Sequence, residues 1–157
     1  KPIEYRNPFS YERYKRIPED ADYCTLWFGI NDSAATDLGS IDDTTNETFY
    51  GGWNVVLEWL LENRPKMKIG IIVTNCGKPE FREATRQCAR KWGIPYLDMM
   101  GDPQVPVIFG RERNMGHTPR SQELRNPHFK VAEENGHPSL WAHEYQSYFI
   151  EAFLRRL

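Results

Sequence analysis

The sequence predicts an α/β domain in which a parallel sheet carries helices on both faces. Short apolar or β-branched runs alternate along the chain with longer segments of helical periodicity. The resulting order is strand, helix, strand, helix, strand and a final helix, and such alternation favours parallel strands joined by helical crossovers. The central run, Met67–Thr74, is almost continuously apolar, as expected of a strand that is covered on both faces.

Length and composition narrow the possible classes of protein. A chain of 157 residues with 39% hydrophobic residues suits one folded domain over residues 1–157. The net charge of −2 provides no basic field for nucleic acid or an anionic membrane. No apolar run approaches the roughly 18 residues of a membrane-spanning helix, and nothing resembles a signal peptide. Three widely spaced cysteines suit a reducing compartment better than a disulfide framework.

Two elements are expected before residue 30. Ser10–Ile17 is predicted to be a short helix with Ser10 as its N-cap. The aromatic and partly β-branched run Tyr23–Phe28 predicts a buried strand, which Gly29 ends.

A long helix is expected between residues 44 and 65. Thr44 and Glu47 have the spacing of a capping box, and Pro65 ends the segment. Gly51 and Gly52 weaken the first turns, which favours close packing there. One helical face is apolar and comprises Phe49, Trp53, Val56, Leu57, Leu60 and Leu61.

The second half of the chain contains two further helices and a strand. Pro79 is placed to begin a helix and Gly93 to end it, and Ile94–Met99 predicts a short strand. The last helix runs from about Ser139 to the end of the chain, with an apolar side assigned to the core: Trp141, Tyr145, Tyr148, Phe149, Ala152 and Phe153. Between these elements, residues 99–136 predict a long functional or mobile loop.

Polar side chains follow the predicted strands. Gly29, Asn31 and Asp32 follow the first strand, Asn75 follows the second, and Asp98 lies near the end of the third. In open α/β sheets, ligands bind beyond the carboxyl ends of the strands. An Asn amide there can donate to a developing oxyanion, which is worth about 3 kcal/mol in acyl transfer. We therefore expect Asn31, Gly29 and Asn75 to line a substrate or oxyanion site, although an Asn-Asp pair also forms ordinary turns.

A histidine stands immediately before the last helix. A His held by a carboxylate can take a proton from a hydroxyl nucleophile, and Glu134 lies three residues before His137. Pro138 fixes the backbone that follows. Either residue alone also fits an ordinary role, His137 in packing at the helix start and Glu134 as a solvated loop charge.

These motifs resemble blocks III and V of the SGNH (GDSL-like) hydrolases. The first is "FGIND" (residues 28–32) after a strand, and the second is a carboxylate-x-x-His-Pro sequence before the terminal helix. From about Asp20 onward the chain resembles the SGNH domains of phage tail proteins and their prophage relatives. The resemblance implies a flavodoxin-like three-layer α/β/α fold and esterase, lipase or deacetylase chemistry. It also implies that Asn31 is an oxyanion-hole residue, that His137 is the general base and that Asp32 is structural.

Two departures from the family pattern affect the predicted mechanism. Glu134 stands where the family usually has the Asp of the triad. No Gly-Asp-Ser tripeptide occurs, and residues 1–22 contain no apolar strand that could carry one. We expect the first strand and the nucleophilic Ser to lie upstream of Lys1, so this chain alone is expected to be inactive. Ser10 and Ser33 are poor substitutes, because neither lies on a strand-to-helix elbow.

The resulting hypothesis is a serine esterase or deacylase that acts on an acyl ester, with a carbohydrate as the expected alcohol. Its partners would be an acylated carbohydrate or small ester and the upstream segment of the same polypeptide, in the bacterial cytoplasm or a phage tail. The alternatives are a non-catalytic module that binds carbohydrate or a host surface, and a self-contained structural domain. No cofactor is needed, and no metal is expected because the histidines lack zinc-site spacing: His117, His128, His137 and His143.

Two further groups have ordinary interpretations. Cys76 follows a predicted strand and is expected to line a pocket, since nothing near it in sequence argues for a lowered thiol pKa. Arg111, Arg113 and Arg120 are expected to form a solvated basic loop, with contact to an anionic or sugar substrate as the alternative.

Overall fold

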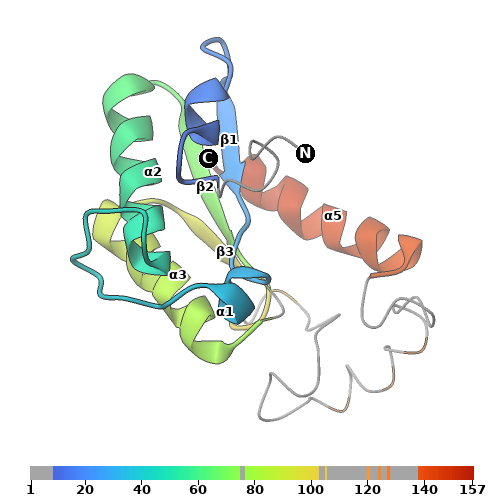
Figure 1. Ribbon diagram of the computed structural model, residues 1–157. Helices are drawn as coiled ribbons and strands as arrows, with labels where there is room; N and C mark the ends of the chain where they lie inside the picture. The colour runs from blue at the N-terminus through green and yellow to red at the C-terminus, as the bar shows by residue number, and fades with distance from the viewer. Residues whose placement is uncertain are drawn as a thin grey trace, which may run out of the picture.

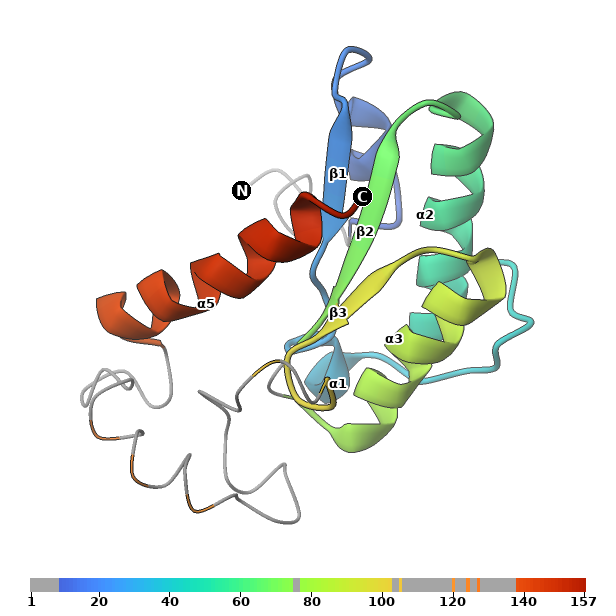
Figure 2. The same ribbon diagram turned by 180° about the vertical axis from the view of Figure 1, so that it is seen from behind.

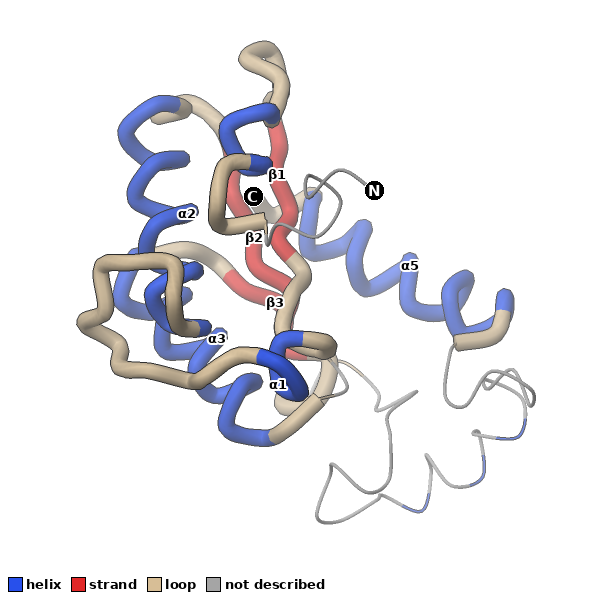
Figure 3. Tube along the Cα trace, viewed as in Figure 1, coloured by secondary structure: helices blue, strands red, loops and turns tan. Residues whose placement is uncertain are grey.

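The structure is a computed structural model that describes residues 9–74, 77–102, 105, 120, 124, 127 and 138–157. Its elements follow the predicted order (Figure 3). They are η2 (Arg13–Arg16), β1 (Tyr23–Leu26), α1 (Asp32–Ala35), α2 (Phe49–Asn63), β2 (Lys68–Val73), α3 (Pro79–Trp92), β3 (Tyr96–Asp98) and α5 (Leu140–Leu154). The predicted loop 99–136 lies largely outside the described residues.

The three strands form one parallel sheet in the order β1-β2-β3. Leu26 pairs with Ile71, and Val73 pairs with Asp98. Helices α2 and α3 cover one face of the sheet and α5 covers the other (Figures 1 and 2). The predicted α/β fold with a parallel sheet between helical layers is therefore confirmed.

Each face of the sheet has its own apolar core. Leu57 of α2 and Ile71 of β2 are fully buried in the larger core, on the α2 and α3 face. The next residue of β2, Ile72, packs on the opposite face with Phe153 of α5. Successive strand residues point to opposite faces, so β2 supplies both cores.

Gly70 of β2 allows α5 to approach the sheet closely. A Cβ at Gly70 would lie 2.8 Å from both Phe153 Cε1 and Leu157 Cδ1. The glycine therefore sets the distance between the sheet and the α5 layer, which a side chain would increase.

Both predicted N-caps in the first half of the chain are wrong. The expected helix over residues 10–17 forms only the short 3-10 helix η2, and the residue at its N-cap is Glu12 rather than Ser10. Helix α2 begins at Phe49, where Thr48 Oγ1 accepts a hydrogen bond from the Gly51 N–H at 3.1 Å. The Phe49 N–H donates to the Asp37 carbonyl at 2.9 Å, so a contact with a more distant part of the chain sets the start of this helix.

The aromatic side of the last helix is only partly core. Phe153 is 3% exposed, whereas Trp141 and Tyr148 are 65% and 63% exposed. Trp141 and Tyr148 are seven residues apart and share a helical face, but α5 turns Ala142, Gln146 and Phe153 inward instead. Leu61 of α2 is also 37% exposed.

No helix in the described part of the chain is both long enough and apolar enough to cross a membrane.

Candidate functional site

The turn after β1 is closed by its own side chains. Gly29 has φ = +115°, a conformation that favours glycine. Its N–H donates a hydrogen bond to Asp32 Oδ2 at 3.1 Å. Ser33 Oγ donates to the Ile30 carbonyl at 3.0 Å, so this hydroxyl is directed back into the turn. The Gly29 N–H is thus used within the turn, and Asp32 holds the turn in shape.

Asn31 projects from this turn. It occupies the N-cap position of α1, but its side chain makes no capping hydrogen bond. Its carbonyl accepts from the Ala34 N–H at 3.1 Å, and its side chain is exposed. The carboxamide is therefore available to an external acceptor, which is the property an oxyanion donor requires.

The loop after β2 packs directly against this turn. Gly77 has φ = +85°, and a Cβ there would lie 3.2 Å from the Gly29 carbonyl oxygen. Arg82 of α3 is 7% exposed and donates from Nη1 to the Gly77 carbonyl at 2.9 Å. The guanidinium thereby fixes the end of the β2 loop beside Gly29.

Sequence reasoning missed both Gly77 and Arg82. A glycine soon after a predicted strand is a weak signal of close backbone approach. An arginine in the first turns of a helix normally indicates a solvated position. Only the tertiary contact between the two loops shows their role.

Asp98, at the end of β3, is a structural residue. Its Oδ1 accepts from the N–H groups of Met100 and Gly101, both at 2.9 Å, and its Oδ2 accepts from Arg86 Nε at 2.6 Å. Burial by itself would raise the pKa of Asp98, but the hydrogen bonds from Arg86 and the backbone outweigh it and lower the pKa. Both oxygens of this ionised carboxylate are therefore occupied.

The described thiols are not activated. Burial raises the pKa of Cys88 to about 12 and also raises the pKa of Cys24. Both therefore remain protonated at neutral pH, unlike a nucleophilic cysteine. Within the same described ranges, no group of three or more His, Cys, Asp or Glu side chains could hold a metal ion.

Several predicted site residues lie outside the described residues: His137, Glu134, Asn75, Cys76, His117, His128, Arg111 and Arg113. The helix that follows His137 begins as expected, with Ser139 as its N-cap and its Oγ accepting from the Ala142 N–H at 3.3 Å. His143 is exposed in the first turn of this helix. The structure thus brings the Gly29–Asp32 turn and Gly77 together, while the roles of His137, Glu134 and Asn75 stay predictions.

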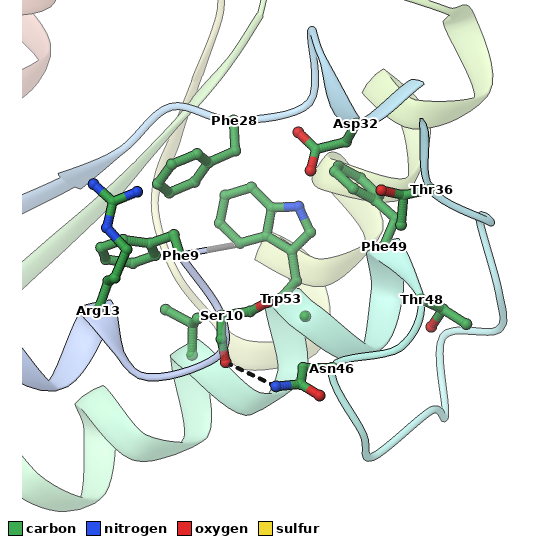
Figure 4. Close-up of a pocket in the computed structure, with 12 residues that line it drawn as sticks. Phe9, Ser10, Arg13, Phe28, Asp32, Thr36, Asn46, Thr48, Phe49 and Trp53 are labelled. Carbon is green, nitrogen blue, oxygen red and sulfur yellow. Dashed lines mark hydrogen bonds between the residues drawn. The ribbon is translucent and has the colours of Figure 1, made fainter. Parts of the chain in front are cut away.

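A pocket of about 210 Å³ opens beside the same turn. The N-terminal segment, the residues after β1 and the first turns of α2 form it (Figure 4). Phe28, Phe49 and Trp53 supply aromatic surface, and Asp32 and Asn46 are among its polar groups.

The fold occurs in solved structures of longer proteins. A protein from Lactobacillus plantarum matches with a TM-score of 0.74 and 21% identity, over 96% of this chain and 74% of its own. A proposed GDSL-like lipase from Bacteroides ovatus matches with a TM-score of 0.65 and 18% identity, over 97% of this chain and 61% of its own. A proposed lipase from Chitinophaga pinensis matches with a TM-score of 0.62 and 16% identity, over 93% of this chain and 75% of its own.

No protein-family profile matches the sequence, and no curated protein does. At these identities the structural matches show that the chain shares an α/β fold with these proteins.

Proposed function

We propose that the chain is the later part of an ester hydrolase domain of the SGNH (GDSL-like) type. The observation that carries the proposal is the exposed Asn31 carboxamide, which lies in the turn after β1 and makes no capping hydrogen bond to α1. The turn that presents it is held by the hydrogen bond between the Gly29 N–H and Asp32. A fold shared with a proposed GDSL-like lipase and a proposed lipase supports this interpretation.

In the proposed reaction, a serine hydroxyl from a segment upstream of Lys1 attacks the acyl carbon of the ester. His137 takes the proton of that hydroxyl, and Glu134 orients the imidazole. The carbonyl oxygen becomes an oxyanion and accepts a hydrogen bond from Asn31. When the intermediate collapses, the alcohol leaves with the proton from His137 and an acyl-serine remains. Water, deprotonated by His137, then releases the acid and restores the serine.

Gly29, Gly77 and the loop after β2 support the proposed oxyanion site. Gly29 carries no side chain, which allows the Phe49 ring to pack closely against the turn after β1. Asn75, two residues before Gly77 in the chain, is proposed to supply a second amide to the oxyanion. The alcohol part of the ester is proposed to be a carbohydrate, and the parent protein a component of a phage tail.

The second candidate is a non-catalytic module of a phage tail that binds carbohydrate or a host surface. It is favoured by the absence of a Gly-Asp-Ser tripeptide from these 157 residues. The aromatic pocket beside Asp32 suits either function.

The two candidates differ in their reaction with a fluorophosphonate. We would treat the protein, produced both as residues 1–157 and with its natural upstream sequence, and locate the label by peptide mass spectrometry. The hydrolase predicts a label on an upstream serine in the longer protein and none on residues 1–157. Labelling of Ser10 or Ser33 would contradict the placement of the nucleophile. No label on either form would leave the binding module.

A further inference from the structure

The pocket beside Asp32 has walls of aromatic rings. Phe9 and Phe28 are stacked, with ring centroids 5.0 Å apart and an interplanar angle of 29°. Phe28 and Phe49 each meet Trp53 edge-on, at centroid distances of 6.0 and 6.3 Å. These side chains come from the N-terminal segment, the residues after β1 and helix α2, and they converge on one pocket (Figure 4).

A buried hydrogen-bond donor lies in this wall. Trp53 is only 4% exposed, and its indole N–H has no hydrogen-bond partner among the described residues. In Figure 4 the indole nitrogen lies on the side of the ring that faces Asp32 and Phe49. A buried N–H without an acceptor costs free energy that a suitably placed ligand oxygen would recover.

An acceptor lies on the same side of the pocket. Asp32 uses Oδ2 to accept the Gly29 N–H, and no bond joins its carboxylate to Trp53. A hydroxyl group can accept from an indole N–H and donate to a carboxylate at the same time. Asn46 donates to the Ser10 carbonyl at 3.3 Å, which leaves its amide oxygen as a further acceptor at the pocket.

The combination of hydroxyl-binding groups and aromatic walls favours a sugar over an acyl chain. A sugar ring carries hydroxyls around its rim and apolar C–H groups on its faces, so it matches both kinds of surface. An acyl chain would leave the Trp53 N–H unpaired and place methylene groups against the Asp32 carboxylate. Arg13 and Asp32 give the pocket one group of each charge, which suits a neutral ligand.

The size of the pocket agrees with a single ring. Its volume of about 210 Å³ far exceeds the roughly 15 Å³ that a single water requires. It is smaller than the approximately 300–1,000 Å³ pockets of drug-sized ligands.

We infer that this pocket binds one neutral sugar ring, with a hydroxyl bridging the Trp53 indole N–H and the Asp32 carboxylate. Asp32 follows Asn31 directly in the chain, so the same turn carries the carboxylate of the pocket and the proposed oxyanion donor. The inference deepens the proposed function and rests on it only in taking this sugar as the alcohol part of the ester. Sugar binding itself can be measured without hydrolysis.

The test uses residues 1–157 and saturation-transfer NMR, which detects weak ligands. The probes are the methyl glycosides of glucose, galactose, mannose, rhamnose and N-acetylglucosamine, with hexanoate as an acyl-chain probe. Trp53→Phe removes the N–H and keeps an aromatic ring. Trp141→Phe makes the same chemical change at a site that is 65% exposed and outside the pocket. Circular dichroism confirms that both variants are folded.

We expect the wild type and Trp141→Phe to bind at least one glycoside with equal affinity. Trp53→Phe should bind the same glycoside about 5- to 10-fold more weakly, as the loss of one hydrogen bond implies. Binding of no glycoside, or equal binding by both variants, would overturn the inference and indicate that the Phe49 ring or water satisfies the indole. Stronger binding of hexanoate at a Trp53-dependent site would make this an acyl pocket instead.

The same variants separate this inference from the hydrolase proposal. Suppose that glycoside binding depends on Trp53 but the upstream-extended protein takes no fluorophosphonate label. The sugar site would then be retained and the hydrolase proposal rejected. Fluorophosphonate labelling without glycoside binding would support the hydrolase proposal and reject the sugar site.

Discussion

At the scale of single residues, two polar side chains near strand ends are used in opposite ways. Asn31 is exposed and its carboxamide makes no capping hydrogen bond. Asp98 is 6% exposed, and its carboxylate accepts hydrogen bonds from Arg86 and two backbone N–H groups. The first side chain can act on a ligand, whereas the second stabilises the fold.

Replacing Asn31 tests the proposed oxyanion donor. In the upstream-extended protein, Asn31→Ala should lower kcat for p-nitrophenyl acetate by about 10²–10³-fold, because a donor to the transition state is lost. KM should change little, since the ground-state carbonyl gains less from this bond. Asn63→Ala, at the far end of α2, is the matched control and should keep full activity. An Asn31→Ala enzyme with unchanged kcat would remove Asn31 from the mechanism.

Acid should weaken the contribution of Asp98 to stability. The pKa of Asp98 is lowered in the folded state, so its stabilisation is present above the unfolded value of about 3.9 and is lost as pH falls through the folded value. We expect Asp98→Asn to cost about 2 kcal/mol in free energy of unfolding at pH 7 and progressively less below about pH 4. Urea denaturation between pH 7 and pH 3 measures this. The exposed Asp20→Asn should change stability by less than about 0.5 kcal/mol.

The difference in free energy of unfolding between the wild type and Asp98→Asn could instead stay constant down to pH 3. That result would show that the hydrogen bonds to Asp98 do not depend on the charge of its carboxylate.

At the scale of elements, the start of α2 shows why adjacent glycines need not be equivalent. A Cβ on Gly51 would collide with the backbone carbonyl oxygen of Thr45. A Cβ on Gly52 would meet only the side chain of Ser10, at 3.3 Å from its Oγ. Backbone cannot move aside as a short side chain can, so only Gly51 is required by packing.

Alanine at these two positions should therefore have different effects. Gly51→Ala should lower the free energy of unfolding by about 2 kcal/mol or more, as an overpacked site does. Gly52→Ala should change it by less than about 1 kcal/mol, because the gain in helix propensity offsets the contact with Ser10. Urea denaturation of the two variants compares them directly. Equal losses would mean that the contact between Thr45 and α2 adapts freely.

At the scale of the whole molecule, the α5 layer packs on one face of the sheet (Figure 1). Among the residues that the structure describes, the core on this face is the smaller one, and Phe153 is its buried aromatic residue from α5. Gly70 allows the helix to close against β2. Helix α5 begins three residues after His137, the proposed base, in the chain.

Truncation of Phe153 should loosen that layer selectively. Phe153→Ala is expected to cost about 3–4 kcal/mol and to raise hydrogen exchange in α5 more than in α2 or α3. Tyr148→Ala, at a side chain that is 63% exposed, should cost less than about 1 kcal/mol. Uniform exchange across all helices in Phe153→Ala would show that the sheet and its two helical layers unfold as one unit.

Much of the fold and part of the candidate site could be predicted from local patterns. The alternation of elements, the apolar β2 run and the bounds of α3 between Pro79 and Gly93 were all predictable, because each depends on residues close together in the chain. The strand before Asn31 was predicted as Tyr23–Phe28 but ends at Leu26, and the short helix α1 that follows Asn31 was not predicted.

Contacts between distant residues decided the rest. The N-cap of α2 is Thr48 and not the expected Thr44, because the Phe49 N–H donates to the Asp37 carbonyl. Trp141 is exposed because α5 packs on the sheet with another face. Arg82 reaches Gly77 beside the Gly29 turn only after β1, β2 and α3 have assembled. The sequence by itself determined the alternation of strands with the helices α2, α3 and α5, and it placed Asn31 shortly after β1. The tertiary structure decided which side chains surround that strand end, since their proximity depends on packing rather than on spacing along the chain.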